Sequence, residues 1–310
     1  MKQLCYLFPG QGAQYVGMGK DLYETSVEAR NVFTKAQEAL PGLDIKRLCF
    51  EGPIEELTQT ANSQVSILVT SIAALEALKQ RIEPQQKDVK VVACAGLSLG
   101  ELTSLVAAKS IEFSDAVRLV RRRGELMEEA SVQNPGSMAS IIGFSFEELK
   151  SVCDENNSEI ANLNCPGQIV ISGAKESVKS SMALALKKGA KKAIALNVSG
   201  GFHSSLMKDA ARLFKIELDK SKFLTPEIGV LSNVSAEYEK TPEEIRENLI
   251  RQLYSPVRWE DSIRKIAAQG IDCFLEIGPG KVLKGLLRRI DASLKVQNIE
   301  KMADINNLIL

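Results

Sequence analysis

The stretch Gly96-Leu97-Ser98-Leu99-Gly100 places a serine between two glycines, where a strand is expected to turn into a helix. Residues 89–95 before it are apolar and β-branched, as in a buried strand, and residues 101–108 after it are helix formers. A sharp turn of this kind exposes a serine hydroxyl above the free N–H groups of a helix N-terminus. The pattern predicts a nucleophilic Ser98; the alternative is an ordinary glycine-rich loop between a strand and a helix.

His203 is the only histidine in the chain, so chemistry that pairs a serine with a histidine has one candidate base. It lies in a glycine-rich turn, residues 199–207, of the kind that presents a side chain to a cleft. An unperturbed imidazole has a pKa of about 6.5, which suits a base that removes a proton from serine. A lone histidine is more often a packed or surface residue. Together with the turn at Ser98, it indicates acyl transfer or hydrolysis through a seryl ester.

Charge and composition argue against several classes of protein. The 310 residues carry 39 basic and 39 acidic side chains, which speaks against a surface devoted to nucleic acid or to an anionic membrane. No apolar run approaches the roughly 20 residues of a membrane span. The apolar start at residues 1–8 is too short for a signal peptide, so we expect none. The cysteines form no C-x-x-C pair, so we expect reduced thiols in a cytoplasmic protein and no metal site. They are Cys5, Cys49, Cys94, Cys153, Cys165 and Cys273.

Strands alternate with helices along the chain, the pattern of a mostly parallel, hydrolase-like α/β sheet. Residues 3–8 predict the first strand, followed by a glycine-rich turn and one helix that reaches about residue 40. Residues 64–81 predict an amphipathic helix, residues 114–130 another, and residues 272–277 a late strand.

Residues 131–199 differ in character from the rest. Their predicted elements alternate as strand, helix, strand, strand, helix and strand, at residues 137–144, 146–156, 160–164, 168–172, 175–188 and 192–198. This βαββαβ order is the ferredoxin-like arrangement. We therefore predict a ferredoxin-like subdomain over residues 131–199, inserted into a discontinuous catalytic α/β domain of residues 1–130 and 200–310.

The turn after the first strand, Gly10-Gln11-Gly12-Ala13-Gln14, partly matches a dinucleotide-binding fingerprint. The match fails at Tyr15, which stands where the third glycine belongs. We interpret the turn as a tight loop whose N–H groups point into a site, as an acyl-transfer enzyme needs to hold an oxyanion.

Arg123 falls on the apolar stripe of the predicted helix 114–130, whereas Arg118, Arg121 and Arg122 fall toward solvent. A guanidinium on a buried face needs an anionic partner, because an unpaired buried charge is costly. Two interpretations stay open at this point. One is a structural salt bridge, which periodicity alone favours, and the other is a bidentate site for a substrate carboxylate.

These residues resemble the malonyl-CoA:acyl carrier protein transacylases of bacterial type II fatty acid synthesis. The resemblance extends from residue 3 to about residue 290. It is carried by seven motifs in order: residues 10–14, residues 96–101, Arg123-Gly124, Asn162-x-Asn164-x-Pro166-Gly167-Gln168, residues 202–207, Gln252-Leu253-x-x-Pro256-Val257 and Glu276-x-Gly278-Pro279-Gly280.

The resemblance implies roles for the residues of the catalytic centre. Ser98 would attack the malonyl thioester, and His203 would take its proton. The backbone N–H groups of Gln11 and Leu99 would form the oxyanion hole. Gln252 would orient the His203 ring, in the place that an aspartate holds in many hydrolases.

The resemblance also implies the substrates. Arg123 would bind the free carboxylate of the malonyl group, and Phe202 would crowd a 2-methyl branch. The acyl group would pass from malonyl-CoA to the phosphopantetheine thiol of acyl carrier protein by a ping-pong route, with no cofactor. We expect a monomer.

One residue departs from the family pattern: Leu97 precedes the nucleophile, where the family usually has histidine. This leaves His203 as the only candidate base. Alternative functions are a trans-acting polyketide acyltransferase, an acyl-CoA thioesterase or serine hydrolase, and an inactive scaffold that only binds a carrier protein.

Overall fold

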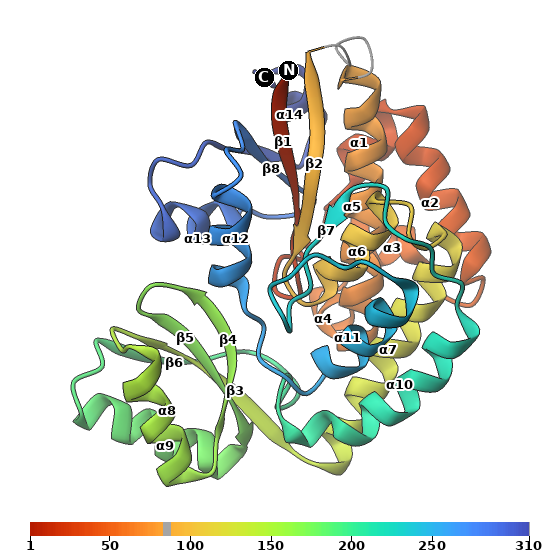
Figure 1. Cartoon of the computed structure of the whole chain (residues 1–310). Coiled ribbons are helices and arrows are strands. Elements are labelled where there is room, and N and C mark those ends of the chain that lie inside the picture. Colours follow the sequence, from red (N-terminus) through yellow and green to blue (C-terminus); the bar gives the residue numbers. More distant parts are fainter. Residues whose placement is uncertain (83–87, 310) are drawn as a thin grey trace.

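Two separate sheets organise the computed structural model, which describes residues 1–82 and 88–309 (Figure 1). In the larger sheet every neighbouring pair of strands is parallel, in the order β7-β2-β1-β8-β9. The strands are β1 (Lys2–Phe8), β2 (Val89–Gly96), β7 (Gly229–Val230), β8 (Cys273–Ile277) and β9 (Val296–Ile299). The predicted mostly parallel α/β architecture is therefore confirmed.

Helices cover both faces of this sheet, and alternate residues of β1 show why. Leu4, Tyr6 and Phe8 belong to the core on the side of the larger helical group, whereas Cys5 and Leu7 face the opposite core. The smaller group contains α12 (Trp259–Ala267) and α13 (Val282–Ile290). The larger group contains α1 (Lys20–Thr25), α2 (Val27–Ala39), α3 (Ile45–Phe50), α4 (Ile54–Thr58), α5 (Thr60–Ile82), α6 (Leu99–Ala107), α7 (Phe113–Gln133), α10 (Lys208–Lys220), α11 (Pro242–Gln252) and α14 (Met302–Asn306).

The single helix predicted to reach residue 40 is wrong, because two helices occupy this segment. α1 ends at Thr25, and Ser26 adopts an extended conformation with φ −117° and ψ 131°. The Ser26 hydroxyl accepts a hydrogen bond from the backbone N–H of Ala29 at 3.1 Å, which caps α2. A serine that satisfies a free helical N–H in this way ends one helix and begins the next.

α5 is longer than the predicted helix and is buried on nearly every side rather than on one stripe. It packs against α2 and α7, between the parallel sheet and the outer helices. By length and composition it could cross a membrane, but 94% of its apolar window is buried inside the protein. α5 is therefore the core helix of the larger helical layer.

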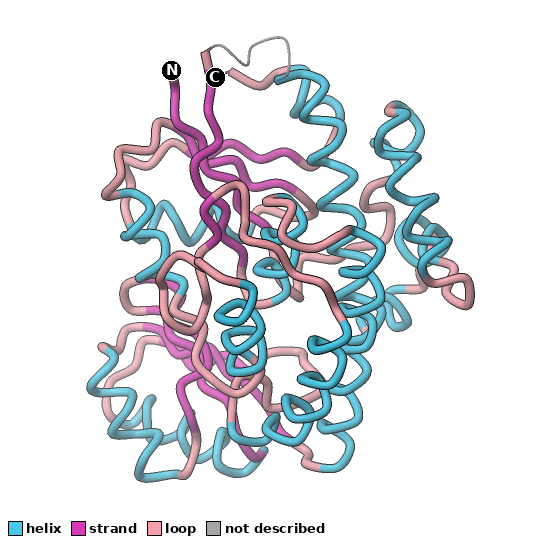
Figure 2. Tube along the Cα trace, turned by 45° about the vertical axis from the view of Figure 1, so that its right-hand side comes forward, coloured by secondary structure: helices cyan, strands magenta, loops and turns pink. Residues whose placement is uncertain are grey.

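The second sheet lies apart from the first (Figure 2). It is antiparallel and has its own apolar core. Its order, β4-β5-β3-β6, is the one expected of a ferredoxin-like βαββαβ unit. The strands are β3 (Gly136–Ile142), β4 (Glu159–Cys165), β5 (Gln168–Ala174) and β6 (Lys192–Ala195), with helices α8 (Phe146–Asn156) and α9 (Lys175–Lys187). β6 ends at Ala195, three residues before the end of the predicted strand 192–198. α7 continues to Gln133, beyond the predicted helix end at residue 130. The domain boundaries at residues 131 and 199 stay a prediction.

Three glycines let the turn after β2 form. A Cβ on Gly96 would lie 1.9 Å from the carbonyl carbon of Gly100, and a Cβ on Gly100 would lie 2.2 Å from the Phe8 oxygen. A Cβ on Gly10 would lie 2.4 Å from the Leu97 oxygen. These close contacts bring the loops after β1 and β2 together at the carboxyl edge of the sheet, where α/β proteins place their sites.

We expect Gly96→Ala to lower the free energy of unfolding by about 3 kcal/mol or more, because the added methyl group meets backbone that cannot move aside. Urea denaturation followed by circular dichroism measures the change. Gly285→Ala is the matched control: it lies in α13 with no atom within 4 Å of the new methyl group. It should be neutral or stabilise by about 1 kcal/mol. Equal stability of the two variants would contradict the packing argument.

Candidate active site

Ser98 adopts a strained backbone conformation at the junction of β2 and α6. Its φ is 53° and its ψ is −102°, values that a residue with a side chain rarely takes. Two side chains hold its peptide groups: the Ser98 N–H donates to Oδ1 of Asn233 at 2.7 Å, and Nε2 of Gln252 donates to the Ser98 carbonyl at 3.0 Å. This geometry is that of a nucleophile elbow.

His203 lies within hydrogen-bond reach of Ser98. Nε2 of His203 is 2.9 Å from Oγ of Ser98, and Nδ1 is 2.7 Å from the backbone carbonyl of Gln252. Because a carbonyl oxygen can only accept, Nδ1 carries the proton and Nε2 is free to accept from the serine hydroxyl. The histidine turn reaches this position by packing closely on α7, where a Cβ on Gly200 would lie 1.9 Å from Oγ of Ser131.

The His203 imidazole is a weaker base than its type suggests. Burial, followed by the positive charge of Arg123, lowers its pKa to about 4, although the bond to the Gln252 carbonyl acts in the opposite direction. The ring is therefore neutral at physiological pH, in the form that accepts a proton. The expectation of a base that titrates near neutrality does not hold in this buried site.

Arg123 is buried beside the nucleophile, with 1% of its surface exposed. Its Nη1 donates to Oε1 of Gln64 at 2.6 Å. Its Nη2 donates to Oγ of Ser98 at 3.1 Å and to Oε1 of Gln252 at 2.9 Å. The serine hydroxyl can accept from Arg123 and donate to His203 at once, so the three side chains form one directed chain of hydrogen bonds.

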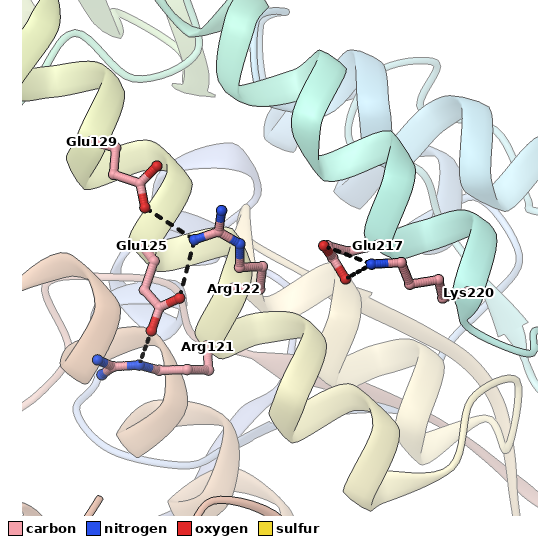
Figure 3. Close-up of polar contacts among 6 residues, drawn as sticks. All are labelled: Arg121, Arg122, Glu125, Glu129, Glu217 and Lys220. Carbon is pink, nitrogen blue, oxygen red and sulfur yellow. Dashed lines mark hydrogen bonds and ion pairs between the residues drawn. The ribbon is translucent and has the colours of Figure 1, made fainter. Parts of the chain in front are cut away.

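The neighbours of Arg123 on α7 behave differently (Figure 3). Arg121 pairs with Glu125 at 2.7 Å, and Arg122 pairs with Glu125 at 3.3 Å and with Glu129 at 3.0 Å; all of these side chains are at least partly exposed. Ion pairs that water reaches in this way contribute little to stability. The helical periodicity thus separated the one inward guanidinium from the outward ones.

The structural salt bridge that periodicity alone favours for Arg123 does not form within residues 1–82 and 88–309. The partners of its terminal nitrogens are two amide oxygens and one hydroxyl, all uncharged. Burial lowers the pKa of Arg123 to about 10, against the stabilising charge of Glu101. The side chain stays positive at neutral pH, and a buried cation whose contacts are neutral can bind an anion brought in by a ligand.

Gln252 contributes in a different way from the one predicted. Its backbone carbonyl, rather than its side chain, contacts the His203 ring. Its side-chain amide instead donates to the Ser98 carbonyl and to Oε2 of Glu101, and accepts from Arg123. The carbonyl takes the place of an aspartate, because it accepts from Nδ1 and so orients the ring. Unlike an aspartate, it adds no negative charge.

The predicted oxyanion donors lie on adjacent loops. Leu99 is the first residue of α6, and Gln11 lies in the loop after β1. Neither backbone N–H donates a hydrogen bond in the part of the chain that the structure describes. Gln11 also lines an open cavity of about 460 Å³ together with Thr60, Asn197 and Ser199. Two N–H groups without an acceptor, one of them directly after the nucleophile in the chain, fit an oxyanion hole.

Two further predicted residues flank the catalytic pair. Phe202 is 4% exposed and directly precedes His203 in the chain. Leu97 is half-buried and packs on the core that contains α12 and α13. Its side chain therefore packs on the side of the turn that faces α12 and α13.

Sequence reasoning missed Asn233, which directly holds the nucleophile, and gave no role to Glu101. Asn233 follows β7, a strand of two residues that is too short to leave a sequence pattern. Glu101 was visible only as the end of the motif at residues 96–101. In the described part of the chain, no group of three histidine, cysteine or acidic residues could hold a metal ion.

Comparison with known proteins gives a consistent result. Residues 5–308 match the acyl transferase domain family. The malonyl CoA-acyl carrier protein transacylase of Bacillus subtilis is 48% identical over 301 residues, which cover 95% of this chain and 92% of that protein. The acyl-carrier-protein-S-malonyltransferase of Bartonella henselae has a TM-score of 0.93 and 39% identity, covering 99% of this chain and 98% of that one. A malonyl-transacylase solved with a type II PKS acyl-carrier protein has a TM-score of 0.92 and 38% identity, covering 98% of both chains.

The pKa of His203 should lie at about 4 in the wild type, because burial and then the positive charge of Arg123 lower it. NMR titration of the imidazole between pH 3.5 and 8 measures this pKa directly, since His203 is the only histidine in the chain, and circular dichroism at each pH verifies folding. In Arg123→Ala the pKa should move toward the usual value of about 6.5, because one of its two causes is removed. A wild-type imidazole that titrates near pH 6.5 would contradict the electrostatic argument.

Proposed function

Because the chain belongs to the malonyl CoA-acyl carrier protein transacylases, we propose that it moves a malonyl group from malonyl-CoA to acyl carrier protein through an ester on Ser98, for fatty acid elongation. The observation that carries the assignment of the site is the contact between Arg123 and the serine. A buried guanidinium with neutral contacts lies 3.1 Å from the nucleophilic oxygen. This arrangement supports a substrate whose acyl group ends in a carboxylate.

In the first half-reaction, Oγ of Ser98 attacks the thioester carbon while Nε2 of His203 takes the hydroxyl proton. The backbone N–H groups of Gln11 and Leu99 stabilise the oxyanion that forms. When the carbon–sulfur bond breaks, the imidazolium returns its proton to the sulfur, and coenzyme A leaves as a thiol. The Gln252 carbonyl holds the ring in the required tautomer throughout.

In the second half-reaction, the phosphopantetheine thiol of the carrier protein gives its proton to His203, and its sulfur attacks the ester carbon. The bond to Oγ of Ser98 breaks, and the serine recovers its proton from the imidazolium. The same groups therefore serve both half-reactions. No step calls for a metal or a redox cofactor.

The buried cation weighs against a thioesterase or lipase. Such an enzyme shares the elbow but needs no buried cation beside it, and Arg123 would be a costly residue to keep there. A scaffold that only binds carrier protein would not need the aligned Ser98, His203 and Arg123. The polyketide alternative shares all of the chemistry, and the relative solved with a type II PKS carrier shows that this fold can serve such a partner.

The physical state of the enzyme is part of the proposal. We propose a monomer in the cytoplasm whose partners are malonyl-CoA and acyl carrier protein, without nucleic acid or membrane. The six cysteines are all free and buried, which fits a reducing compartment. Phe202 is proposed to crowd a 2-methyl branch, a discrimination worth about 1–3 kcal/mol.

Ser98→Ala should abolish the acyl-enzyme, because Ser98 carries the only hydroxyl bonded to His203 in the described chain. Intact-mass analysis after mixing with malonyl-CoA, and then with pantetheinylated carrier protein, follows the group from enzyme to carrier. Ser104→Ala is the control, since its hydroxyl is bonded to the Gly100 carbonyl within α6. A malonyl adduct on the Ser98 variant would assign the nucleophile elsewhere, and release of malonate without transfer would favour a hydrolase.

Arg123→Ala should lower kcat/KM for malonyl-CoA by roughly 30-fold to several thousand-fold, because the malonyl carboxylate loses a partner worth about 2–5 kcal/mol. Turnover of acetyl-CoA, which has no carboxylate, should stay level or rise. Arg118→Ala on the same helix is the control, because its exposed guanidinium pairs only with Asp115 of the described residues. Equal losses on both substrates, in a variant whose thermal melt shows that it is folded, would return Arg123 to a structural role.

A further inference from the structure

Two buried carboxyl groups lie behind the nucleophile, and the reaction above uses neither. Glu101 is on α6 and is 0% exposed; Glu239 lies between β7 and α11 and is 5% exposed. Oε2 of Glu101 accepts from Nε2 of Gln252 at 2.7 Å and from the backbone N–H of Asn233 at 2.8 Å. The Glu239 carboxyl accepts from Nδ2 of Asn248 at 3.1 and 3.3 Å.

The two groups that Glu101 contacts are the two that hold Ser98. Oδ1 of Asn233 accepts from the Ser98 N–H, and Nε2 of Gln252 donates to the Ser98 carbonyl. Asn233 is fixed further by its own Nδ2, which donates to the Gly96 carbonyl at 2.8 Å. Glu101 thus binds both holders of a strained residue without touching the reacting atoms, and strain of this kind persists only where the surroundings impose it.

The charges around the pair indicate where its proton lies. Glu101 faces the positive Arg123 and the carboxyl of Glu239, whereas Glu239 faces Glu101 and Glu244. Burial raises the pKa of Glu101 to about 7; burial and the charge of Glu101 raise the pKa of Glu239 to about 9. Two adjacent carboxylates do not both ionise in a buried site. The proton therefore resides on Glu239 at neutral pH.

The second oxygen of Glu101 gives that proton an acceptor. Oε1 of Glu101 is buried and, among the residues that the structure describes, has no hydrogen-bond donor as long as Glu239 is ionised. A protonated Glu239 supplies the missing donor, and a buried acceptor without one would be costly.

We propose that Glu101 is a positioning residue for acyl transfer. Its carboxylate accepts a hydrogen bond from a protonated Glu239, fixes Asn233 and Gln252, and thereby keeps Ser98 in its reactive conformation. This inference rests on the seryl transfer proposed above. Arg123 also has an anchor outside this network, because Gln64 binds its Nη1. Loss of the network should therefore slow acylation by the same factor for any acyl-CoA, whereas loss of Arg123 should slow acylation by malonyl-CoA more than acylation by acetyl-CoA.

The test compares rapid-quench acylation rates of the wild type, Glu101→Ala, Glu239→Ala and Glu239→Gln, with malonyl-CoA and with acetyl-CoA. Both alanine variants should be slower by about 10- to 100-fold, by the same factor on the two substrates. Glu239→Gln should recover to within about threefold of the wild type, because its amide donates to Glu101 as the protonated acid does. Glutamine as slow as alanine at position 239, or normal acylation of Glu101→Ala, would overturn the proposal.

A matched control separates positioning from stability. Glu276 is also 0% exposed and accepts from the N–H groups of Leu283 and Lys284 at 2.9 and 2.8 Å, but it does not contact the groups that hold Ser98. Glu276→Gln should lower the melting temperature and leave the acylation rate of the folded enzyme unchanged. Should Glu101→Ala fail to fold, the alanine and glutamine pair at position 239 still decides the question.

A pH profile gives a readout that packing alone would not move. Acylation by the wild type should fall as the pH rises through about 9, where Glu239 loses its proton, and Glu239→Gln should lack this fall. Both proteins contain Arg123, whose pKa is about 10, so any decline of the acylation rate above that pH should be the same in both. Identical alkaline profiles of the wild type and Glu239→Gln would overturn the proposal that a proton on Glu239 is shared with Glu101. Absence of a malonyl ester on wild-type Ser98 would instead overturn the proposed function.

Discussion

The site depends on burying one positive charge beside a nucleophile. Arg123 contacts Ser98, Gln64 and Gln252, and none of these partners is charged. The cation lowers the pKa of His203, stabilises the ionised form of Glu101 and leaves its charge available for a substrate carboxylate. A buried charge whose direct contacts are all neutral costs free energy that the rest of the fold must supply. We see that cost as the origin of selectivity for malonyl-CoA over acetyl-CoA. The malonyl carboxylate pairs with the buried guanidinium and offsets the cost, whereas an acetyl group has no charge to do so.

The fold provides this arrangement through close backbone contacts at one edge of a parallel sheet. β1 and β2 run side by side, so the loops that follow them meet, and the glycines at positions 10, 96 and 100 allow their backbones to touch. The contact forces Ser98 into its strained conformation and exposes the first N–H groups of α6. The second sheet is tied to the same region by β4, because Leu163 and Val257 form a backbone hydrogen bond of 2.9 Å.

Features of the fold that depend on neighbouring residues in the chain could be predicted from the sequence. The strand, turn and helix around Ser98 and the inward face of Arg123 follow from local periodicity, and the βαββαβ order follows from alternating elements. The helix break at Ser26 was missed because it rests on one side chain that caps the next helix. Asn233 and the carbonyl role of Gln252 could not be read from the sequence, since they arise where segments more than 100 residues from Ser98 converge on it. Backbone groups leave no signature in a sequence.

Arg123 is the proposed partner of the substrate carboxylate, and a crystal structure of the enzyme trapped as its malonyl ester on Ser98 tests this role most directly. We expect the malonyl carboxylate to accept two hydrogen bonds from the guanidinium at about 2.7–2.9 Å, displacing the contact with Ser98 or Gln252. Electron density with the carboxylate turned toward solvent, and Arg123 still bound to Gln64, Gln252 and the serine oxygen, would contradict the account.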